Sequence, residues 1–432
     1  MMFAALVPDC RTTSVVSPCL PRLVLIAGWI SILTGCGGDA HPTFDYSVEC
    51  ATSPCATRVS LGYDHACAVL SDQSVACWGN NDVGQVGLAP DGTGIPVSHP
   101  NTVPALTQVV DVGAGSQFSC ALTEGREVYC WGSNAAGMLG NGMAADDSAH
   151  ATPNRVPLSG PVEELSVGAR FVLARMNDGS VYGWGDGIDG ELANESVVNW
   201  YLPNPTLIAG LGNAFAISAG ELTACAIVGQ GEAQCWGRTG DPVAAAGEPG
   251  TALMSSDGVV RVVPTAVPNL GVVWQVSTGV RAAVAAANIG GVYGWGDSRW
   301  GLLEFPQGNP ASWFSSRRVG SPPYDFSGDV VGLTLGDNHG CALVGSGKVQ
   351  CWGDNESGQL GLGRATPTWP QAIHDVLALE NIVHVDAGGD ATCALNRGGH
   401  VYCWGANRFD QLGQSNGGDV TAIQATPSLV QW

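Results

Sequence analysis

Charged residues are scarce in this chain of 432 residues, and basic side chains are the scarcest. Charged residues make up 13% of the sequence, and 17 lysines and arginines stand against 38 acidic residues, which gives a formal net charge of -21. A surface with this balance repels nucleic acid and anionic lipid headgroups. The composition therefore argues against a nucleic-acid partner.

The familiar sequence signatures of catalysis are absent as well. The sequence has no Gly-x-Ser-x-Gly elbow, no phosphate-binding loop and no His-Glu-x-x-His, and its eight His residues lack ligand spacing. Asp186, Asp189 and Glu191 could bind Ca²⁺ weakly, but a solvated turn is the more economical interpretation. We therefore expect a chain that is not an enzyme and that uses no cofactor or metal.

The apolar run near the N-terminus is too short for a comfortable membrane span. It covers residues 23–33 and follows two arginines, which is typical of a signal-peptide core. The run ends in Leu33-Thr34-Gly35-Cys36, which resembles the bacterial lipobox, where the Cys thiol is diacylated and becomes the mature N-terminus. This predicts a lipoprotein signal peptide at 1–35, lipidation of Cys36 and a tether at 36–57; an ordinary secretory signal is the alternative.

By the same resemblance, Gly37 after the cysteine favours anchoring in the outer membrane. The mature chain is then an exported lipoprotein of the cell envelope, with the lipid as its contact to the membrane. The sequence leaves open whether the anchor faces inward or outward.

What the sequence does contain is a sevenfold repeat. Trp-Gly dipeptides recur at intervals of 53, 53, 52, 59, 57 and 52 residues. The segments between them are rich in Gly, Val and Thr and show no amphipathic helical stripe, so each unit is expected to be a small sheet. The repeated tryptophans are Trp78, Trp131, Trp184, Trp236, Trp295, Trp352 and Trp404.

Seven small sheets bury their apolar faces most simply as a closed ring. The 61 Gly and 25 Pro residues fit a protein with many short strands and turns. We therefore predict an all-β fold, a seven-bladed β-propeller of four-stranded blades over residues 58–432. The tail at 425–432 is expected to pair into the blade begun at the N-terminus, so that the ring closes by pairing of the N- and C-terminal segments.

The cysteines test export independently. Five pairs are separated by ten positions, and the second member of each directly precedes a Trp-Gly. The third and fifth repeats carry Leu173 with Gly183 and Val284 with Gly294 instead, so both thiols are present or both are absent. Disulfide partners behave in this way, and they require an oxidising compartment. The expected bridges are Cys67 with Cys77, Cys120 with Cys130, Cys225 with Cys235, Cys341 with Cys351, and Cys393 with Cys403; whether Cys50 and Cys55 pair stays open.

The turn chemistry predicts the same register as the cysteines. Six residues after the first cysteine position, five repeats have Gly, as a three-residue hairpin loop with a left-handed third residue requires. This turn sets the two cysteines directly opposite each other, within disulfide range. Gln73 and Arg126 occupy the Gly position in the first two repeats, so we expect those turns to differ.

At the level of whole units, the residues match a family. The pattern Gly-x-x-His, Cys-Ala-Leu, a hairpin, Val-Tyr-x-Trp-Gly and Asn-x-x-Gly-Gln-Leu-Gly resembles the regulator of chromosome condensation repeat over roughly residues 58–432. The exits "WGNNDVGQVG", "WGDNESGQLGLG" and "WGANRFDQLG" are close matches, whereas "WGRTGDPV" from Trp236 departs. The family His survives only as His65 and His339, which favours a packing role.

The resemblance implies a fold more firmly than an activity. The founding members are seven-bladed propellers, and the eukaryotic founder is a guanine-nucleotide exchange factor that docks on chromatin. Bacterial relatives include secreted propellers that bind proteins. An exported, acidic chain fits the second group, so nucleotide exchange is only a remote alternative.

We therefore interpret the chain as a monomeric, non-enzymatic propeller that binds or scaffolds an unknown protein. An envelope lectin or a polysaccharide-directed enzyme is the alternative. Insertions in the repeat carry aromatic residues that could serve as binding anchors or could cap the blades. These candidates are Trp200, Tyr201, Trp300, Trp313, Phe314, Tyr324 and Trp369.

Overall fold

The protein is described by a computed structural model that covers residues 44–50, 53–193, 201–239, 252–255, 258–288, 291–296, 302, 317–319, 325–367 and 372–432. Cys36 and the expected signal peptide lie outside these residues. The described residues form strands, turns and loops, and no helix among them is long and apolar enough to cross a membrane.

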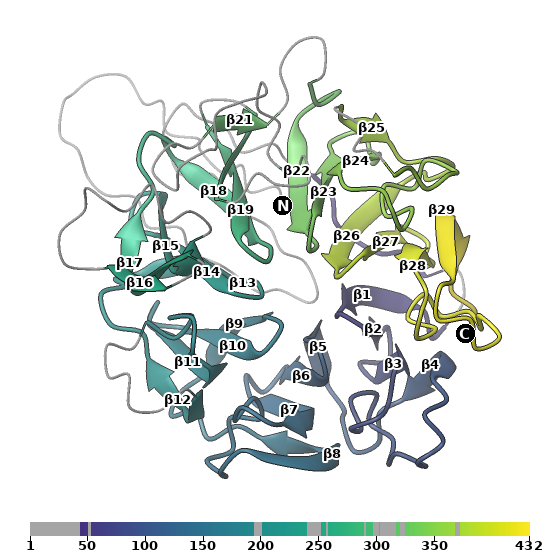
Figure 1. Cartoon of the computed structure of the whole chain (residues 1–432), viewed down its shortest axis with the longest axis horizontal. Helices are drawn as coiled ribbons and strands as arrows, with labels where there is room; N and C mark the ends of the chain where they lie inside the picture. Colours follow the sequence, from purple (N-terminus) through teal and green to yellow (C-terminus); the bar gives the residue numbers. More distant parts are fainter. Residues whose placement is uncertain are drawn as a thin grey trace, which may run out of the picture. The chain divides into compact units, whose positions relative to one another are not determined.

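Seven antiparallel sheets are arranged in a ring, which confirms the predicted all-β seven-bladed propeller (Figure 1). Each sheet is one blade and uses consecutive strands, from the channel outward. Blades 1 to 3 are β1 (Ala56–Leu61), β2 (His65–Leu70), β3 (Val75–Gly79), β4 (Val97–Thr102); β5 (Val109–Ala114), β6 (Phe118–Thr123), β7 (Val128–Asn134), β8 (Asp146–Arg155); and β9 (Val162–Val167), β10 (Phe171–Met176), β11 (Val181–Asp186), β12 (Tyr201–Leu207).

The remaining four blades follow the same plan. Blade 4 has a fifth strand, because a hairpin extends its outer edge in the order β13-β14-β15-β17-β16. Blades 4 and 5 are β13 (Ala214–Ala219), β14 (Thr223–Val228), β15 (Glu232–Thr239), β16 (Ala252–Ser255), β17 (Gly258–Ala266); and β18 (Val273–Thr278), β19 (Ala282–Ala287), β20 (Val292–Gly296), β21 (Arg317–Val319). Blades 6 and 7 are β22 (Val330–Leu335), β23 (His339–Val344), β24 (Val349–Gly353), β25 (His374–Asp375); and β26 (Ile382–Gly388), β27 (Ala391–Asn396), β28 (Val401–Ala406), β29 (Ile423–Leu429).

The second and third strands of each blade form the hairpin that the sequence predicts. Cys67 lies directly opposite Cys77, and in all five cysteine-bearing blades the two partners are disulfide-bonded with a Cα–Cα distance of 4.1 Å. Cys50 and Cys55 form a sixth disulfide. Closing an eleven-residue loop is worth about 2.5–3 kcal/mol in the chain-entropy treatment of disulfides.

The turns of the first two blades do not differ from the others, so that expectation is wrong. Gln73 and Arg126 take φ values of 65° and 63°, in the same left-handed region as Gly179 at 81°. The cost of a left-handed side chain, about 1–2 kcal/mol, is evidently tolerated because the paired strands and the disulfide define the turn.

Neighbouring blades pack through the repeated tryptophans, whose seven side chains are fully buried. Six of the seven indoles donate a hydrogen bond to a backbone carbonyl in the exit loop of the preceding blade. Trp131 donates to the Gln85 carbonyl at 2.9 Å, and Trp404 to the Gln359 carbonyl at 2.8 Å. The series continues across the chain ends, where Trp78 donates to the Gln411 carbonyl at 2.9 Å.

A second set of contacts joins the innermost strands. At the position seven residues before the first cysteine position, a side-chain oxygen accepts the backbone N–H of the next blade, as Ser60 does from Ala114 at 3.2 Å. Asp386 of blade 7 accepts from the Leu61 N–H of blade 1 at 2.8 Å. Blade 2 has Gly113 and makes no such bond. The acceptors are Ser60, Ser166, Ser218, Ser277, Thr334 and Asp386.

The ring therefore closes between two complete blades, and the expectation that residues 425–432 pair into the first blade is wrong. Strand β29 pairs with β28 of its own blade, with Tyr402 opposite Leu429. The residues after β29 do reach blade 1, because Val430 is buried in one core with β1 and β2. Trp432 also packs edge-on against Trp78, with ring centroids 6.0 Å apart.

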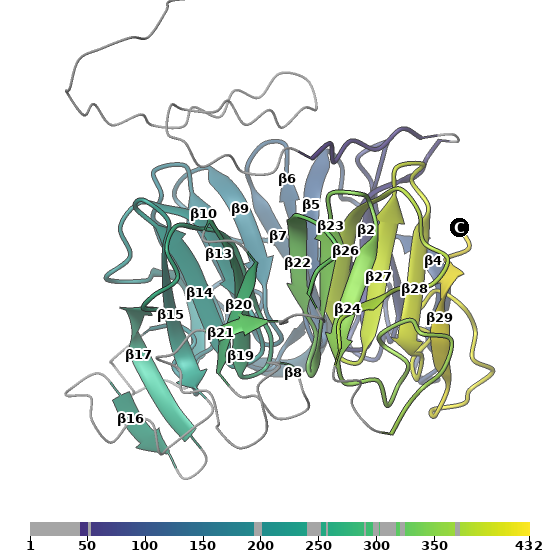
Figure 2. The same ribbon diagram turned by 90° about the horizontal axis from the view of Figure 1, so that it is seen from above.

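Residues 44–50, which the sequence places in the tether, pack against the propeller. We name this segment the N-terminal strap. Glu49 donates its backbone N–H to the Arg397 carbonyl at 2.7 Å, and the Tyr46 hydroxyl donates to the Val331 carbonyl at 2.6 Å. Phe44 and Val48 pack against buried cores of blades 6, 7 and 1. The strap lies on the face of the ring opposite the β16–β17 hairpin (Figure 2).

Candidate functional site at the channel mouth

The two faces of the ring are built from different turns. The turns between second and third strands form one face, here called the hairpin face, which carries the strap. The turns between first and second strands form the other, together with the loops that follow the third strands; we call it the exit face. A backbone hydrogen bond of 2.9 Å from Asn80 to the Asp64 carbonyl ties such a loop to its turn.

Glycines crowd the turns of the exit face around the central channel. A Cβ at Gly168 would collide with the carbonyl of Gly220 in the next blade, and one at Gly388 would collide with the carbonyl of Leu61. The same obstruction recurs at each inner turn, so glycine lets the seven backbones converge. The turns enclose a recess of about 90 Å³ at the channel mouth. A wider channel section of about 240 Å³ lies among the inner strands.

Three carboxylates gather at this mouth. Glu221, Asp337 and Asp390 come from the inner turns of blades 4, 6 and 7. Burial, followed by the charges of Glu221 and Asp390, raises the pKa of Asp337 to about 7. Burial also raises the pKa of Glu221 and of Asp390, by more than the charges of Arg281 and Arg408 lower it. Among the described residues, none of these three carboxylates forms an ion pair.

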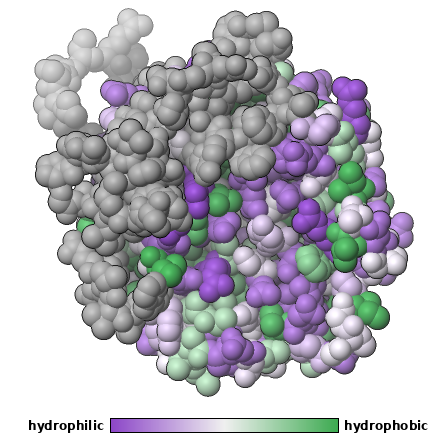
Figure 3. Space-filling model, viewed as in Figure 1, coloured by the Kyte–Doolittle hydropathy of each residue, from purple (hydrophilic) through white to green (hydrophobic). Residues whose placement is uncertain are grey.

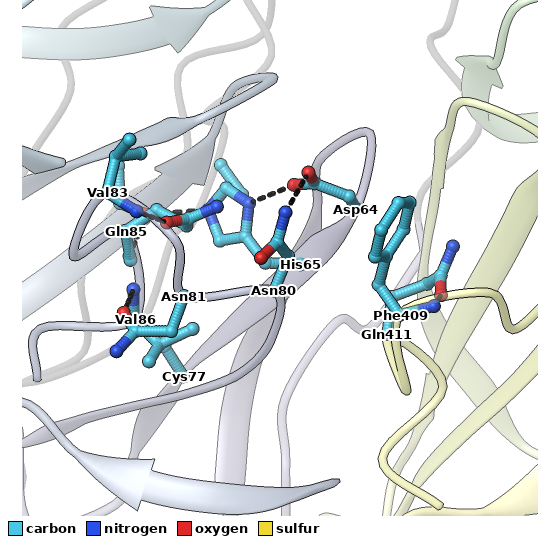
Figure 4. Close-up of polar contacts among 12 residues, drawn as sticks. Asp64, His65, Cys77, Asn80, Asn81, Val83, Gln85, Val86, Phe409 and Gln411 are labelled. Atoms are coloured by element: carbon cyan, nitrogen blue, oxygen red, sulfur yellow. Dashed lines mark hydrogen bonds and ion pairs between the residues drawn. The ribbon is translucent and has the colours of Figure 1, made fainter. Parts of the chain in front are cut away.

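One exposed aromatic side chain lines the mouth with the carboxylates, and a second lies elsewhere on the exit face. Tyr63, 52% exposed, lies on the inner turn of blade 1, near enough to Asp337 of blade 6 to feel its charge. The Asp337 charge, more than burial, raises the pKa of Tyr63. Phe409, 36% exposed, is in the exit loop of blade 7 and lies toward Asp64 and Asn80 of blade 1 (Figure 4). The mouth thus combines negative charge with aromatic surface.

The described residues on the face seen in Figure 3 form no large apolar patch. In the view along the ring axis, the described surface is mostly hydrophilic, with isolated hydrophobic side chains (Figure 3). Isolated apolar residues of this kind are ordinary on a soluble surface. Any binding at the exit face is therefore expected to depend on charge as much as on apolar contact.

The two family histidines belong to the packing between blades. His339 is fully buried, and its Nε2 lies 2.8 Å from the Thr392 hydroxyl, which donates to the Gln359 carbonyl at 3.1 Å. A hydroxyl has one hydrogen to donate, so His339 must donate from Nε2. Burial lowers the pKa of His339 to about 3, so the ring is neutral. His65 makes the equivalent contact to Ser119 at 2.8 Å.

The acidic triplet of the third repeat is also structural. Glu191 is buried and accepts the Asp189 N–H at 2.8 Å, in the place that Gln359 fills for Ser357 in blade 6. Burial raises the pKa of Glu191 well above its usual range. Asp189 forms an ion pair with Arg238. Over the described ranges, no cluster of three or more His, Cys, Asp or Glu side chains could hold a metal ion.

Of the seven aromatic residues predicted as binding anchors, only Tyr201 lies among the described residues. Tyr201 is half-buried, packs against the core between blades 2 and 3, and accepts the Ala145 N–H at 3.4 Å, so it caps a blade edge. The other six, Trp200, Trp300, Trp313, Phe314, Tyr324 and Trp369, lie outside the described residues.

Sequence reasoning missed the mouth residues, although a signal was present. Tyr63, Glu221 and Asp337 each directly follow the glycine of the Gly-x-x-His position. Lining up the seven repeats would have shown that this position varies while its glycine does not. The carboxylates are more than 50 residues apart in sequence, and only the closed ring brings them together.

A rigid ring with variable side chains around its mouth defines a class of protein, the protein-binding propeller. The regulator of chromosome condensation (RCC1) repeat matches residues 56–85, 109–137, 330–359 and 382–411, and a second description of this repeat matches 73–122 and 346–395. The chain belongs to the RCC1 repeat family.

Relatives of known sequence and structure share the repeat. HERC2, an E3 ubiquitin-protein ligase of Mus musculus, is 32% identical over 366 residues, or 83% of this chain, but the match spans 7% of HERC2. The ultraviolet-B receptor UVR8 of Arabidopsis thaliana is 27% identical over 82% of this chain and 78% of the receptor. The crystal structure of human WBSCR16 superposes with a TM-score of 0.67 at 22% identity, covering 80% of this chain and 88% of that one.

Proposed function

We propose that the chain is a non-catalytic propeller of the cell envelope that binds another protein through the acidic mouth of its exit face. The partner segment that fits this mouth is basic, because a lysine or arginine side chain would relieve the repulsion among Glu221, Asp337 and Asp390. The observation that carries the proposal is this group of carboxylates, which form no ion pair among the described residues, beside exposed Tyr63.

A lipid on Cys36 would hold the propeller at a membrane. The lipobox-like sequence and the six disulfides support export to an oxidising compartment. The mass of the chain isolated from cells tests the anchor, since a diacylated N-terminal cysteine has a defined mass. A Cys36→Ser variant should lose that mass and leave the membrane fraction.

The related propellers favour recognition over catalysis by the ring itself. One solved structure with this fold, that of yeast Prp20p, is described with its binding to Gsp1p and histones, and it is 20% identical to this chain. At that identity the likeness concerns the fold, so nucleotide exchange remains a remote alternative here. No described contact favours the glycan-directed alternative.

Binding to the mouth is tested with a synthetic decapeptide of alternating Arg and Gly. The triple variant Glu221→Gln, Asp337→Asn, Asp390→Asn should bind the peptide at least about tenfold more weakly, because the negative charge shared by the three carboxyl groups is lost. The matched control Asp72→Asn, Asp178→Asn, Glu232→Gln removes the same number of carboxylates from the hairpin face. Equal weakening in the two variants would show that net charge alone, and not the mouth, attracts the peptide.

The native partner is then sought in envelope extracts. Protein captured by the unmodified chain but not by the mouth triple variant, and still captured by the control variant, is the expected partner. If a monosaccharide mixture releases the captured material instead, the glycan-binding alternative replaces this proposal.

A further inference from the structure

The N-terminal strap gives the propeller a direction relative to the membrane. We infer that the hairpin face is held toward the lipid surface and that the exit face, with its acidic mouth, is turned away. This inference rests on the proposed lipid at Cys36, and it concerns which face remains free for a protein partner.

The first observation is the strength of the strap's attachment. The Arg397 guanidinium forms an ion pair with Asp45 at 2.7 Å and donates to the Ser47 hydroxyl at 2.9 Å. It also donates to the Asp45 carbonyl at 2.7 Å and to the Ser47 carbonyl at 3.2 Å. One side chain therefore grips two residues of the strap at four acceptors, in a geometry that suits a planar guanidinium.

The second observation is that the strap is fixed at both ends. Its first described residue, Phe44, packs against two buried clusters, one of which contains Val383 of blade 7 and the other Val331 of blade 6. At its other end, Cys50 is bonded to Cys55, and Ala56 donates its N–H to the Gly399 carbonyl at 3.2 Å. Arg397 and Gly399 lie in the turn between β27 and β28, which belongs to the hairpin face.

The third observation is the short chain between the strap and the lipid position. Phe44 is eight positions after Cys36, and a fully extended chain spans about 27 Å over eight positions. A blade strand of six residues is about 20 Å long, so the ring has about that height. A linker of this length that starts on the hairpin face would use most of its reach to follow the side of the ring as far as the exit face. It cannot then also allow the exit face to lie flat on the bilayer.

The orientation is measured by energy transfer from the protein to a rhodamine lipid in vesicles of phosphatidylethanolamine and phosphatidylglycerol. A clickable azido amino acid replaces Ser346 in a hairpin-face turn or, in the matched variant, Glu356 in an exit-face loop of the same blade; both positions are exposed. The full chain carries a lipid at Cys36, added by the cell or, if cells add none, by chemical coupling. A chain without a cellular lipid would refute the anchor without touching the orientation.

A donor at position 346 should transfer at least about twice as efficiently as one at position 356. Arg397→Ala should loosen the strap and narrow the difference between the two efficiencies, whereas the control Arg408→Ala on the exit face should leave the difference intact. Equal transfer from the two positions in the unmodified chain, or stronger transfer from 356, would overturn the inference. So would a difference that survives Arg397→Ala unchanged.

Discussion

Two junctions between blades differ in their hydrogen bonding, and the junction at the chain ends is the one with the complete set of contacts. Between blades 7 and 1, where the chain begins and ends, Trp78 reaches the Gln411 carbonyl, Asp386 accepts the Leu61 N–H, and Val430 is buried. Between blades 4 and 5, within continuous chain, the Trp295 indole is fully buried and its N–H has no acceptor among the described residues.

The comparison shows that a junction formed where the chain begins and ends can carry the same repeat contacts as a junction within continuous chain. The exit of blade 7 carries Asn407 and Gln411 in the family pattern, and Leu412 donates its N–H to the Asn407 side chain at 3.0 Å. The exit of blade 4, "WGRTGDPV", lacks this pattern. The site depends on the junction between blades 7 and 1, here called the seam, because Tyr63 of blade 1 lies beside the inner turn of blade 7 and is close enough to Asp337 of blade 6 to feel its charge.

Deleting residues 425–432 should have the largest effect on stability. The deletion removes most of β29 and the buried Val430, so we expect a loss of at least about 4 kcal/mol from the burial and hydrogen bonds that disappear. Chemical denaturation measures the loss. Deleting the exposed exit segment 416–420 is the control, and equal stability of the two deletions would contradict the account of the seam.

Replacing the repeated tryptophan by phenylalanine should separate the two junctions. Trp78→Phe leaves the buried Gln411 carbonyl without its donor, whereas Trp295→Phe removes an N–H that has no acceptor among the described residues. Both changes lose similar ring volume, so Trp78→Phe should cost about 1–2 kcal/mol more than Trp295→Phe. Thermal unfolding of the two variants checks the difference, and the opposite order would show that the seam is the weaker junction.

At the seam, the acceptor at position 386 matters more than its charge. Asp386→Ala should cost about 1–2 kcal/mol because the Leu61 N–H loses its partner. Asp386→Ser should recover at least half of that loss, since Ser60, Ser166, Ser218 and Ser277 accept the equivalent hydrogen bond at other junctions. Urea unfolding provides the comparison. If the serine variant is as unstable as the alanine variant, the carboxylate has a role beyond this hydrogen bond.

The mouth should make stability depend on pH. Folding raises the pKa of Asp337 from its ordinary 3.8 to about 7, so the folded protein holds this proton more tightly than the unfolded chain. Stability should therefore fall as pH rises between these two values. Asp337→Asn should remove this part of the slope and stabilise the protein above pH 7 by about 1–2 kcal/mol, less than the full shift implies because water reaches the mouth. An unchanged pH profile of the unfolding midpoint would contradict the assignment.

The smallest expected effect concerns the first hairpin. Gln73→Gly should stabilise the protein by about 0.5–1 kcal/mol, because the left-handed turn position suits glycine, less the entropy that glycine adds to the unfolded chain. Gly179→Gln in blade 3 makes the reverse change and should destabilise by a similar amount. Differential scanning calorimetry resolves shifts of this size.

Much of the fold follows from local sequence. The spacing of Cys67 and Cys77 and the turn residue Gly179 predict hairpins, and a period near 53 residues predicts the ring. The predicted pairing of the C-terminal tail with the first blade was wrong because β1 and β29 each pair within their own four-stranded blade. The sequence therefore needs no shared blade.

The candidate site is less accessible to such reasoning. Tyr63 belongs to blade 1 and Asp337 to blade 6. The shifts in their pKa values come from burial and from charges on other blades, which no single repeat contains. In the sequence Glu191 resembles a metal ligand. In the exit loop it is buried, and it accepts the same backbone hydrogen bond that Gln359 accepts in blade 6. Charge at a ring mouth arises only once the ring is closed.

The exchange of the indole N–H protons with deuterium, followed by NMR, tests this account most directly. Because the blade 7 to blade 1 seam is built like the other complete junctions, the Trp78 proton should exchange as slowly as those of Trp131 and Trp404, and the Trp295 proton should exchange first. A Trp78 proton that exchanges before Trp295 would show that the ring opens at its termini, and the seam that holds Tyr63 near Asp337 would then be the weak point of the molecule.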